Sequence, residues 1–281
     1  MSRAFCRTGG PVGLRLWQIS LFLLMLGFWQ LAATDAQLAF FLGEPIQVLG
    51  RIWSWFAPWS LGPNALFPQG LAGNADIYRH LATTLIETLL AFGIGTVMGL
   101  VFGLWLALNR QMSAVLEPYI KAANAMPRVI LAPIFAMWFG LGIWSKVALA
   151  VTLVFFIVFF NVYQGVREVS PVVLANARML GANRRQLLRT VYLPSAMAWV
   201  FSSLHTAVGL AFVGAVVGEY LGSARGVGYL IQQAEGTFDV NTVFAGIVLL
   251  TMCALLLDGL VGWFERRLMT WQPRQGETEK L

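Results

Sequence analysis

Six long apolar stretches, separated by short polar segments, dominate the chain. A membrane-spanning helix needs roughly 20 mostly apolar residues, and the stretches that meet this length are about Leu16–Ala33, Leu85–Leu108, Ala122–Phe139, Val147–Tyr163, Ala196–Gly218 and Val243–Trp263. The third contains Pro127 and Pro133, so we expect a kinked span, because neighbouring helices can satisfy the carbonyls that proline frees. The pattern predicts an all-α membrane protein with six transmembrane helices and no large domain outside the membrane.

A polar, arginine-rich segment, Ala175–Pro194 (ANARMLGANRRQLLRTVYLP), separates the fourth apolar stretch from the fifth. Helix-forming residues occupy Pro171–Leu180, Gly181 interrupts them, and the amphipathic run Asn183–Val191 follows and ends before Leu193-Pro194. Glycine adopts the backbone angles of a tight turn without steric cost. The segment therefore predicts a short helix, a turn and a second helix, a shape that suits docking into a groove of another protein.

Composition and charge support this class and orient the chain. Hydrophobic residues make up 58% of the sequence and charged residues 11%, and the mean hydropathy is +0.70. With the N-terminus inside, fifteen of the 19 lysines and arginines fall on the inner side, and four lie outside: Arg51, Arg79, Lys146 and Arg225. Because positive residues concentrate on the cytoplasmic side, both termini are predicted to be cytoplasmic. The basic balance reflects this asymmetry and does not indicate nucleic-acid binding.

The first apolar stretch could also be a cleaved signal peptide. Its end at Leu31-Ala32-Ala33 resembles a cleavage site only loosely, and the run is long for such a peptide, so a retained helix is favoured.

Enzymatic chemistry has little support in the sequence. The two cysteines, Cys6 and Cys253, fall in different environments, and the two histidines, His80 and His205, are too far apart to suggest a metal site. Phosphate-binding loops, nucleophile elbows and zinc-binding helix signatures do not occur. We therefore expect no catalytic site, no metal and no cofactor.

Two segments are predicted to lie outside. Thr34–His80 is rich in tryptophan, proline and glycine, which is typical of interfacial aromatic anchoring. Glu219–Thr242 alternates glycine turns with a helix-like stretch, Tyr229–Ala234. This second segment could form a structured cap at the outer mouth of a pathway or an ordinary loop.

The arginine-rich segment resembles a known motif. Gly181, followed after nine residues by Val191-x-Leu193-Pro194, is similar to the EAA loop of permease subunits of bacterial ABC importers (Glu-Ala-Ala, three residues, Gly, nine residues, Ile-x-Leu-Pro). Other motifs resemble the nitrate, sulfonate, taurine and bicarbonate branch: Trp29, His80-Leu81-x-x-Thr84-Leu85, Pro127 with Pro133 and Trp138-Phe139-Gly140, Gly218-Glu219 with Arg225-Gly226-Val227-Gly228, and Glu265-Arg266-Arg267 with Trp271.

The chain departs from the family pattern at several positions. Ala175 replaces the glutamate of the motif and Asn176 its first alanine, whereas Ala177 is kept. The loss of the acid removes one possible contact to an ATPase subunit. Relatives often have proline near Ala198 and arginine near His205, and this chain has neither.

The resemblance implies a type I ABC importer permease fold with a cytoplasmic coupling helix, in the bacterial inner membrane. Residues 1–15 and 272–281 would be cytoplasmic tails, and 16–271 one permease domain with its coupling loop at 167–194. Two copies would form a homodimeric pore, each inserting the loop helix into an ABC ATPase subunit, and a periplasmic or lipid-anchored solute-binding protein would deliver a small anion such as a sulfonate, taurine, nitrate or bicarbonate. A six-helix subunit could hardly enclose a selective path alone, which also favours a dimer.

The predicted ATPase-coupling residues combine an apolar set with a polar set around the turn: Ala177, Leu180, Gly181, Arg184, Arg185, Leu187, Leu188, Arg189, Leu193 and Pro194. The arginines could instead attract lipid headgroups, which contributes about 1 kcal/mol per residue near an anionic membrane surface. Pro194 is expected to begin the fifth span, where its missing N–H is harmless.

Ionisable residues inside spans are functional candidates because burying them is costly. Glu87 is expected to reach the membrane interface, and Asp258 to make a structural hydrogen bond. His205 lies eleven residues after Pro194, roughly 16 Å along a helix, so it is a candidate for the substrate pathway together with Glu219; buried bonding between helices is the alternative for His205. Gly95, Gly99 and Gly103 form a ridge that predicts close helix packing.

Two other classes of function were compared with the importer subunit. A secondary transporter or channel without ATP would be expected to show inverted repeats, which are not evident, and would leave the arginine-rich segment without a role. A membrane-embedded enzyme would need a clustered nucleophile, base or metal-ligand set, which the sequence lacks.

Overall fold

The computed structural model describes residues 11–56 and 74–268. The predictions for Cys6, Trp271, the tail 272–281 and the start of the tail 1–15 lie outside these residues. The described residues are helical, without a strand, and they fall into two compact units. The first unit contains the residues up to Ile77 and Ile231–Leu249, and the second contains Tyr78–Leu230 and the residues from Leu250 onward.

Five described helices are long and apolar enough to cross a membrane, and their apolar parts are Arg15–Ala32, Ile77–Leu108, Ile143–Arg167, Arg184–Gly222 and Val240–Arg267. They belong to α1 (Pro11–Ala32), α4 (Asn74–Leu108), α7 (Ile143–Arg167), α10 (Leu193–Gly222) with the turns before it, and α12 (Val240–Leu268). A bent pair of helices supplies a sixth candidate. The prediction of an all-α membrane protein is confirmed.

The predicted third span, Ala122–Phe139, has different bounds in the structure. α5 (Arg110–Ala125) and α6 (Leu131–Phe139) meet at 76°, joined by the 3₁₀ turn η2 (Arg128–Ile130). Pro127 causes the break, because the residue before a proline avoids the helical region, and Met126 is extended at ψ 134°. Pro133 was expected to interrupt the span as well, but it lies in the first turn of α6, where its missing N–H costs nothing.

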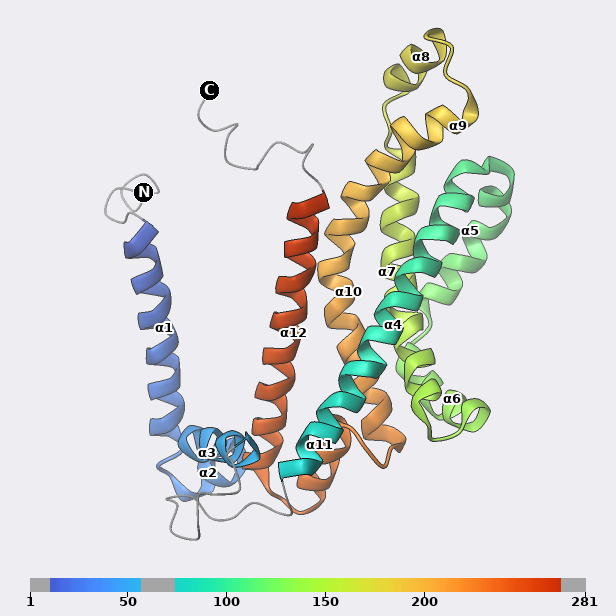
Figure 1. The fold of residues 1–281 in the computed structure, drawn as a ribbon. Helices are drawn as coiled ribbons and strands as arrows, with labels where there is room; N and C mark the ends of the chain where they lie inside the picture. The colour runs from blue at the N-terminus through green and yellow to red at the C-terminus, as the bar shows by residue number, and fades with distance from the viewer. Residues whose placement is uncertain (1–10, 57–73, 269–281) are drawn as a thin grey trace. The chain divides into compact units, whose positions relative to one another are not determined.

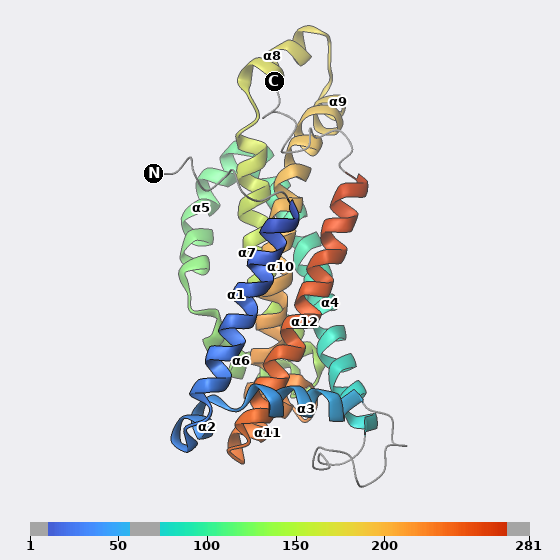
Figure 2. The same cartoon turned by 90° about the vertical axis from the view of Figure 1, so that its left-hand side faces the viewer.

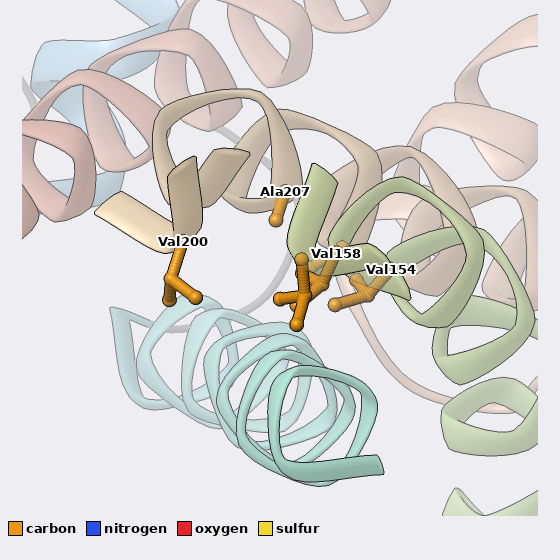
Figure 3. Close-up of a cluster of buried hydrophobic side chains, with 6 residues drawn as sticks. Val154, Val158, Val200 and Ala207 are labelled. Carbon is orange, nitrogen blue, oxygen red and sulfur yellow. The ribbon is translucent and has the colours of Figure 1, made fainter. Parts of the chain in front are cut away.

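The core of the second unit lies between α7 and α10. Val154, Val158 and Val162, spaced by four residues on α7, are fully buried against Val200, Ala207 and Ala211 of α10. Phe92, Leu100 and Leu104 of α4 pack against this cluster. Figure 3 shows the cluster, with Val154, Val158, Val200 and Ala207 labelled. The four-residue spacing places the valines on one face of α7, which explains why this span is buried on that side.

The glycine ridge of α4 packs closely on another helix, as predicted, and that helix is α7. A Cβ atom added at Gly95 would lie 2.7 Å from Val154, and one added at Gly99 would lie 2.8 Å from Val158. At Gly103 it would lie 2.9 Å from the carbonyl oxygen of Phe159. The absence of side chains on this ridge therefore lets the two backbones approach.

We expect Gly99→Ala to destabilise the second unit, because the added methyl group would overlap Val158 and the backbone of α7. Overpacking of this kind costs about 1–3 kcal/mol. Thermal unfolding of the purified chain in detergent measures the effect. Gly93→Ala is the matched control, since a Cβ atom there would meet nothing within 4 Å; equal loss in both variants would contradict this packing.

The first unit joins α1, α2 (Ala36–Leu42) and α3 (Pro45–Phe56) to the start of α12. Both views show α3 lying across the first turns of α12 (Figures 1 and 2), where Arg51 forms a 2.9 Å ion pair with Asp239. The Glu44 amide donates to Asn241 Oδ1 at 2.8 Å. In the Trp-rich segment, residues 34–56 thus form two short helices and residues 74–80 begin α4; the prediction of aromatic anchoring for residues 57–73 lies outside the described residues.

Candidate functional site

The arginine-rich segment forms a helical hairpin between α7 and α10, as predicted. α8 (Pro171–Met179) ends at Gly181, whose φ is +85°. The Ala182 amide donates to the Ala177 carbonyl at 3.1 Å, and the Gly181 amide to that of Arg178 at 2.9 Å. These two bonds with a left-handed residue between them form a Schellman motif, which ends helices most readily at glycine. Gly181 is therefore the turn of the hairpin.

The second arm of the hairpin begins at Asn183. Its side chain accepts from the Gln186 amide at 2.9 Å, and the Gln186 side chain accepts from the Asn183 amide at 2.8 Å. This capping box starts α9 (Arg184–Leu187).

The expected end of the second helix before Leu193-Pro194 is wrong. α9 continues through a π turn, Leu188–Tyr192, into α10, where Leu193 and Pro194 occupy the first turn. A π turn changes the hydrogen-bond register, and proline lacks the N–H that a regular helix interior would use. Pro194 is thus accommodated without ending the helix, and its predicted place at the start of the fifth span is confirmed.

The tip of the hairpin, here Met179 and Leu180, presents apolar side chains to the surroundings. The side chains are 79% and 88% exposed, respectively. Figure 1 shows α8 and α9 projecting past the ends of α7 and α10. Arg184, Arg185 and Arg189 are also exposed, whereas Leu187 is buried within its own chain and Leu188 is half-buried. Two exposed apolar side chains at a hydrogen-bonded turn, with arginines beside them, suit contact with a protein surface.

A buried charge cluster occupies the other end of the same helices. It consists of Thr84 and Glu87 of α4, Lys146 of α7 and Glu219 of α10, each at most 4% exposed. Glu219 accepts hydrogen bonds of 2.7 Å from the Thr84 hydroxyl and from the Gly228 amide. Glu87 Oε1 lies 3.5 Å from Lys146 Nζ. The cluster therefore connects three helices and the segment that begins α11 (Val227–Gly236).

This arrangement corrects the expectation for Glu87. Its side chain does not reach the membrane interface; it is 0% exposed, because Lys146 reaches it from α7. Lys146, which the charge count places in an outer loop, is 4% exposed and donates to the Leu141 carbonyl at 3.2 Å. The sequence contains no signal for this pair, since the two residues lie in different spans and only the fold brings them together.

The glycine-rich segment after α10 is held by hydrogen bonds, as expected of a structured segment; its place as a cap at the outer mouth of a pathway stays a prediction. The Gly226 amide donates to His80 Nδ1 at 2.9 Å, and the Val227 amide to the Thr84 hydroxyl at 2.9 Å. Gly226 has φ +115°, and a Cβ atom there would overlap the Glu219 carboxylate. The backbone of this segment is thus held against the side chains of His80, Thr84 and Glu219.

His205 joins α10 to α12. Its Nδ1 lies 2.6 Å from Asp258 Oδ1 and its Nε2 lies 3.0 Å from Glu265 Oε2. The structural hydrogen bond expected of Asp258 is present. The alternative for His205, buried bonding between helices, is met in part: the ring contacts α12, but its side chain is 37% exposed. His205 and Glu219, the two candidates for the substrate pathway, are fourteen residues apart on α10, roughly 21 Å along the helix, so the structure does not bring them together.

No described group of three or more histidine, cysteine, aspartate or glutamate side chains could hold a metal ion. Cys253 is a buried free thiol.

Comparisons with known proteins agree with these features. Residues 95–270 match the family model described as "Binding-protein-dependent transport system inner membrane component". The chain is 34% identical to a probable ABC transporter permease protein of Haemophilus influenzae over 80% of its length and 96% of that protein. It is also 34% identical to the riboflavin transport system permease protein of Chloroflexus aurantiacus, over 89% of the chain and 88% of the relative.

Another relative, the taurine transport system permease protein of Escherichia coli, is 29% identical over 90% of the chain and 88% of its own length. Among solved structures, an inward-facing form of the MetNI methionine ABC transporter matches with a TM-score of 0.59 and 20% identity, over 68% of this chain and 95% of the other. This structural similarity confirms the fold.

Proposed function

Since this chain belongs to the family of binding-protein-dependent transport system inner membrane components, and is thus a multi-pass permease subunit of an ABC importer in the inner membrane, we propose that its α8–α9 hairpin couples a separate ATPase to the movement of a small anion. The hairpin carries this proposal because it is the hydrogen-bonded, exposed element at one end of the helices that hold the core. We infer that the subunit itself has no catalytic site.

The contact that we propose centres on the hairpin tip. Met179 and Leu180 would enter an apolar cleft of the ATPase subunit, and Arg184, Arg185 and Arg189 would contact polar groups at its rim. α9 has no break before α10, since the π turn connects them. A displacement of the hairpin by the ATPase would therefore be passed along α10, which packs against α7 through the valine cluster.

The partners follow from the same proposal. A homodimer of this chain would enclose the path, two ATPase subunits would bind the hairpins, and a periplasmic or lipid-anchored solute-binding protein would deliver the solute at the end that holds the buried charge cluster. The exposed apolar faces of the helices would meet membrane lipids. An ATP-independent transporter is not favoured, because the family of the chain consists of subunits that depend on other proteins of the transport system.

Co-purification tests the docking surface. The affinity-tagged chain, expressed with the other subunits of its importer, is expected to retain an ATPase subunit that binds labelled ATP. Leu180→Asp should lose it, because the charge would have to be buried in an apolar cleft. Arg110→Gln, an exposed change at the same end of the bundle but outside the hairpin, is the control. Retention of the ATPase by both variants would refute docking at the tip.

The proposed solute is a small organic anion of the sulfonate class. The relative named for taurine transport covers nine-tenths of the chain. The relative named for riboflavin transport makes a heteroaromatic vitamin or vitamin precursor the second candidate. Uptake of labelled taurine and of labelled riboflavin into vesicles that contain the complete importer and its binding protein would separate the two.

Orientation is also part of the proposal. With both termini cytoplasmic, a single cysteine placed at Asn183 should react with a membrane-permeant reagent only, and one at Gly236 also with an impermeant reagent added outside. Cys6 and Cys253 are replaced by serine beforehand. The opposite labelling pattern would place the hairpin outside and end the coupling proposal.

A further inference from the structure

Charge does not balance in the buried charge cluster if every member is ionised. Glu87 and Glu219 are both 0% exposed, and Lys146, the cation that pairs with Glu87, is 4% exposed. Two carboxylates and one ammonium group would leave one net negative charge. An uncompensated buried charge is strongly destabilising, and a bound proton would remove it.

The surrounding groups do not supply the missing positive charge. His80 Nδ1 accepts a hydrogen bond from the Gly226 amide, so this nitrogen carries no proton, and the ring stacks on Tyr229 of α11. Arg79 and Arg225, the arginines nearest in sequence to the elements around the cluster, are exposed. On α4, α7, α10 and the start of α11, Lys146 is thus the buried cation that faces the two acids.

Hydrogen bonding distinguishes the two carboxyl groups. Glu219 accepts from the Thr84 hydroxyl and the Gly228 amide, two bonds that favour its ionised form. Neither oxygen of Glu87 accepts a hydrogen bond from the residues that the structure describes, although both are buried. The two carboxyl groups interact electrostatically within the cluster; two carboxylates are both acceptors, so a hydrogen bond between them would require a proton on one.

We propose that Glu87 is a buried proton-binding site, in which the Glu87 carboxyl donates a hydrogen bond to ionised Glu219 while Lys146 neutralises the remaining charge. The bound proton keeps α4 joined to α10 and to the segment Gly226–Gly228. When water enters this end of the bundle, the proton passes to water and Glu87 becomes a carboxylate. The site itself stands independently of the proposed function; the release of its proton on opening rests on that function, in which this end opens to the solute.

Infrared spectroscopy of the full chain in lipid nanodiscs tests the site. The carbonyl stretching band of a protonated carboxyl should be present at neutral pH and shift on hydrogen–deuterium exchange. Glu87→Gln, which keeps the shape and the donor of the protonated side chain, should lose the band. Glu117→Gln, at a half-buried acid of α5 that pairs with Lys121, should leave it unchanged. A band that persists unchanged in Glu87→Gln would overturn the assignment.

Lys146→Met is an independent test, because it should increase the carboxyl band that Glu87→Gln removes. Without the cation both acids need a proton, so the band should roughly double in area, as expected when the neutralising charge is removed. Unchanged intensity in a folded Lys146→Met chain would overturn the proposal, and so would absence of the band from the unmodified chain, even if Glu87→Gln did not fold.

Release on opening has its own measurement. Alkaline pH should favour the open end, because the closed cluster binds one more proton than the open one. A cysteine is placed at Ala224, an exposed position in the glycine-rich segment after α10. Its rate of reaction with a thiolate-specific reagent is measured as a function of pH and corrected for ionisation of the thiol. The rate should rise with pH in the unmodified chain and become independent of pH in Glu87→Gln. The same pH dependence in both would refute proton release at Glu87, whereas failure of solute uptake alone would count against the proposed function.

Discussion

Gly181→Val is expected to abolish most solute uptake while the chain still inserts, folds and binds lipid normally. Gly181 has φ +85° in the Schellman motif, and a β-branched residue is a steric outlier in that region. The strain would break the bond from the Ala182 amide to Ala177 and change the direction in which the tip points. Coupling free energies between sites are typically about 1–3 kcal/mol, or about 5–150-fold in affinity, so the affinity of the hairpin for the ATPase should fall within that range and uptake should fall with it.

The matched control is Gly181→Asn, since asparagine tolerates the left-handed region better than other residues with a side chain. It should retain much of the uptake. The added atoms themselves have room at this position, because a Cβ atom at Gly181 would meet nothing within 4 Å, so any difference between the variants reports backbone conformation. Uptake and ATP hydrolysis are measured in reconstituted vesicles at equal protein content. Normal uptake by the valine variant would show that the hairpin turn is not the coupling element.

The hairpin could be predicted from the sequence because its determinants are local. Gly181 in a helix-forming context favours the end of the first helix, and the pair Asn183 and Gln186 favours the start of the second. Both effects act within a few residues. The break at Pro127 is local as well, and its position was identified, but the sequence did not show that Pro133 would fall in a first turn. That depended on where α6 begins, which tertiary packing decides.

The buried charge cluster could not be predicted, because its members meet only through the fold. Glu87 stands alone within an apolar stretch and Lys146 just before another, and a long charged side chain near the end of a span can keep its charged head in water at the interface. The glycine ridge on α4 indicated close packing without naming its partner helix. Once α4 lies on α7, the positions of Glu87 and Lys146 follow, since the contact from Gly95 to Val154 fixes the register of the two helices.

His205→Ala is expected to loosen α12 from α10, because it leaves Asp258 and Glu265 without the group that they share. An imidazole that donates to both carboxylates must be protonated at both nitrogens, since the neutral ring has one N–H. Removing it should lower the free energy of unfolding by about 1–3 kcal/mol, less than the loss for a fully buried ion pair because the side chain is partly exposed. Thermal unfolding in detergent measures this loss, and His205→Arg should restore most of it by retaining a cation.

A second comparison separates this structural role from the predicted place of His205 in the substrate pathway. The triple variant His205→Ala, Asp258→Asn, Glu265→Gln removes the imidazole together with the two charges that would otherwise repel. If the imidazole only joins the helices, the triple variant should recover both stability and uptake relative to His205→Ala alone, because the uncompensated carboxylates are gone. If His205 also attracts an anionic solute, stability should recover while uptake stays low, and His205→Arg should transport faster than either. Equal uptake by the unmodified chain, His205→Ala and His205→Arg would exclude a place for His205 in the substrate pathway, whereas equal thermal stability of the three would exclude its structural role.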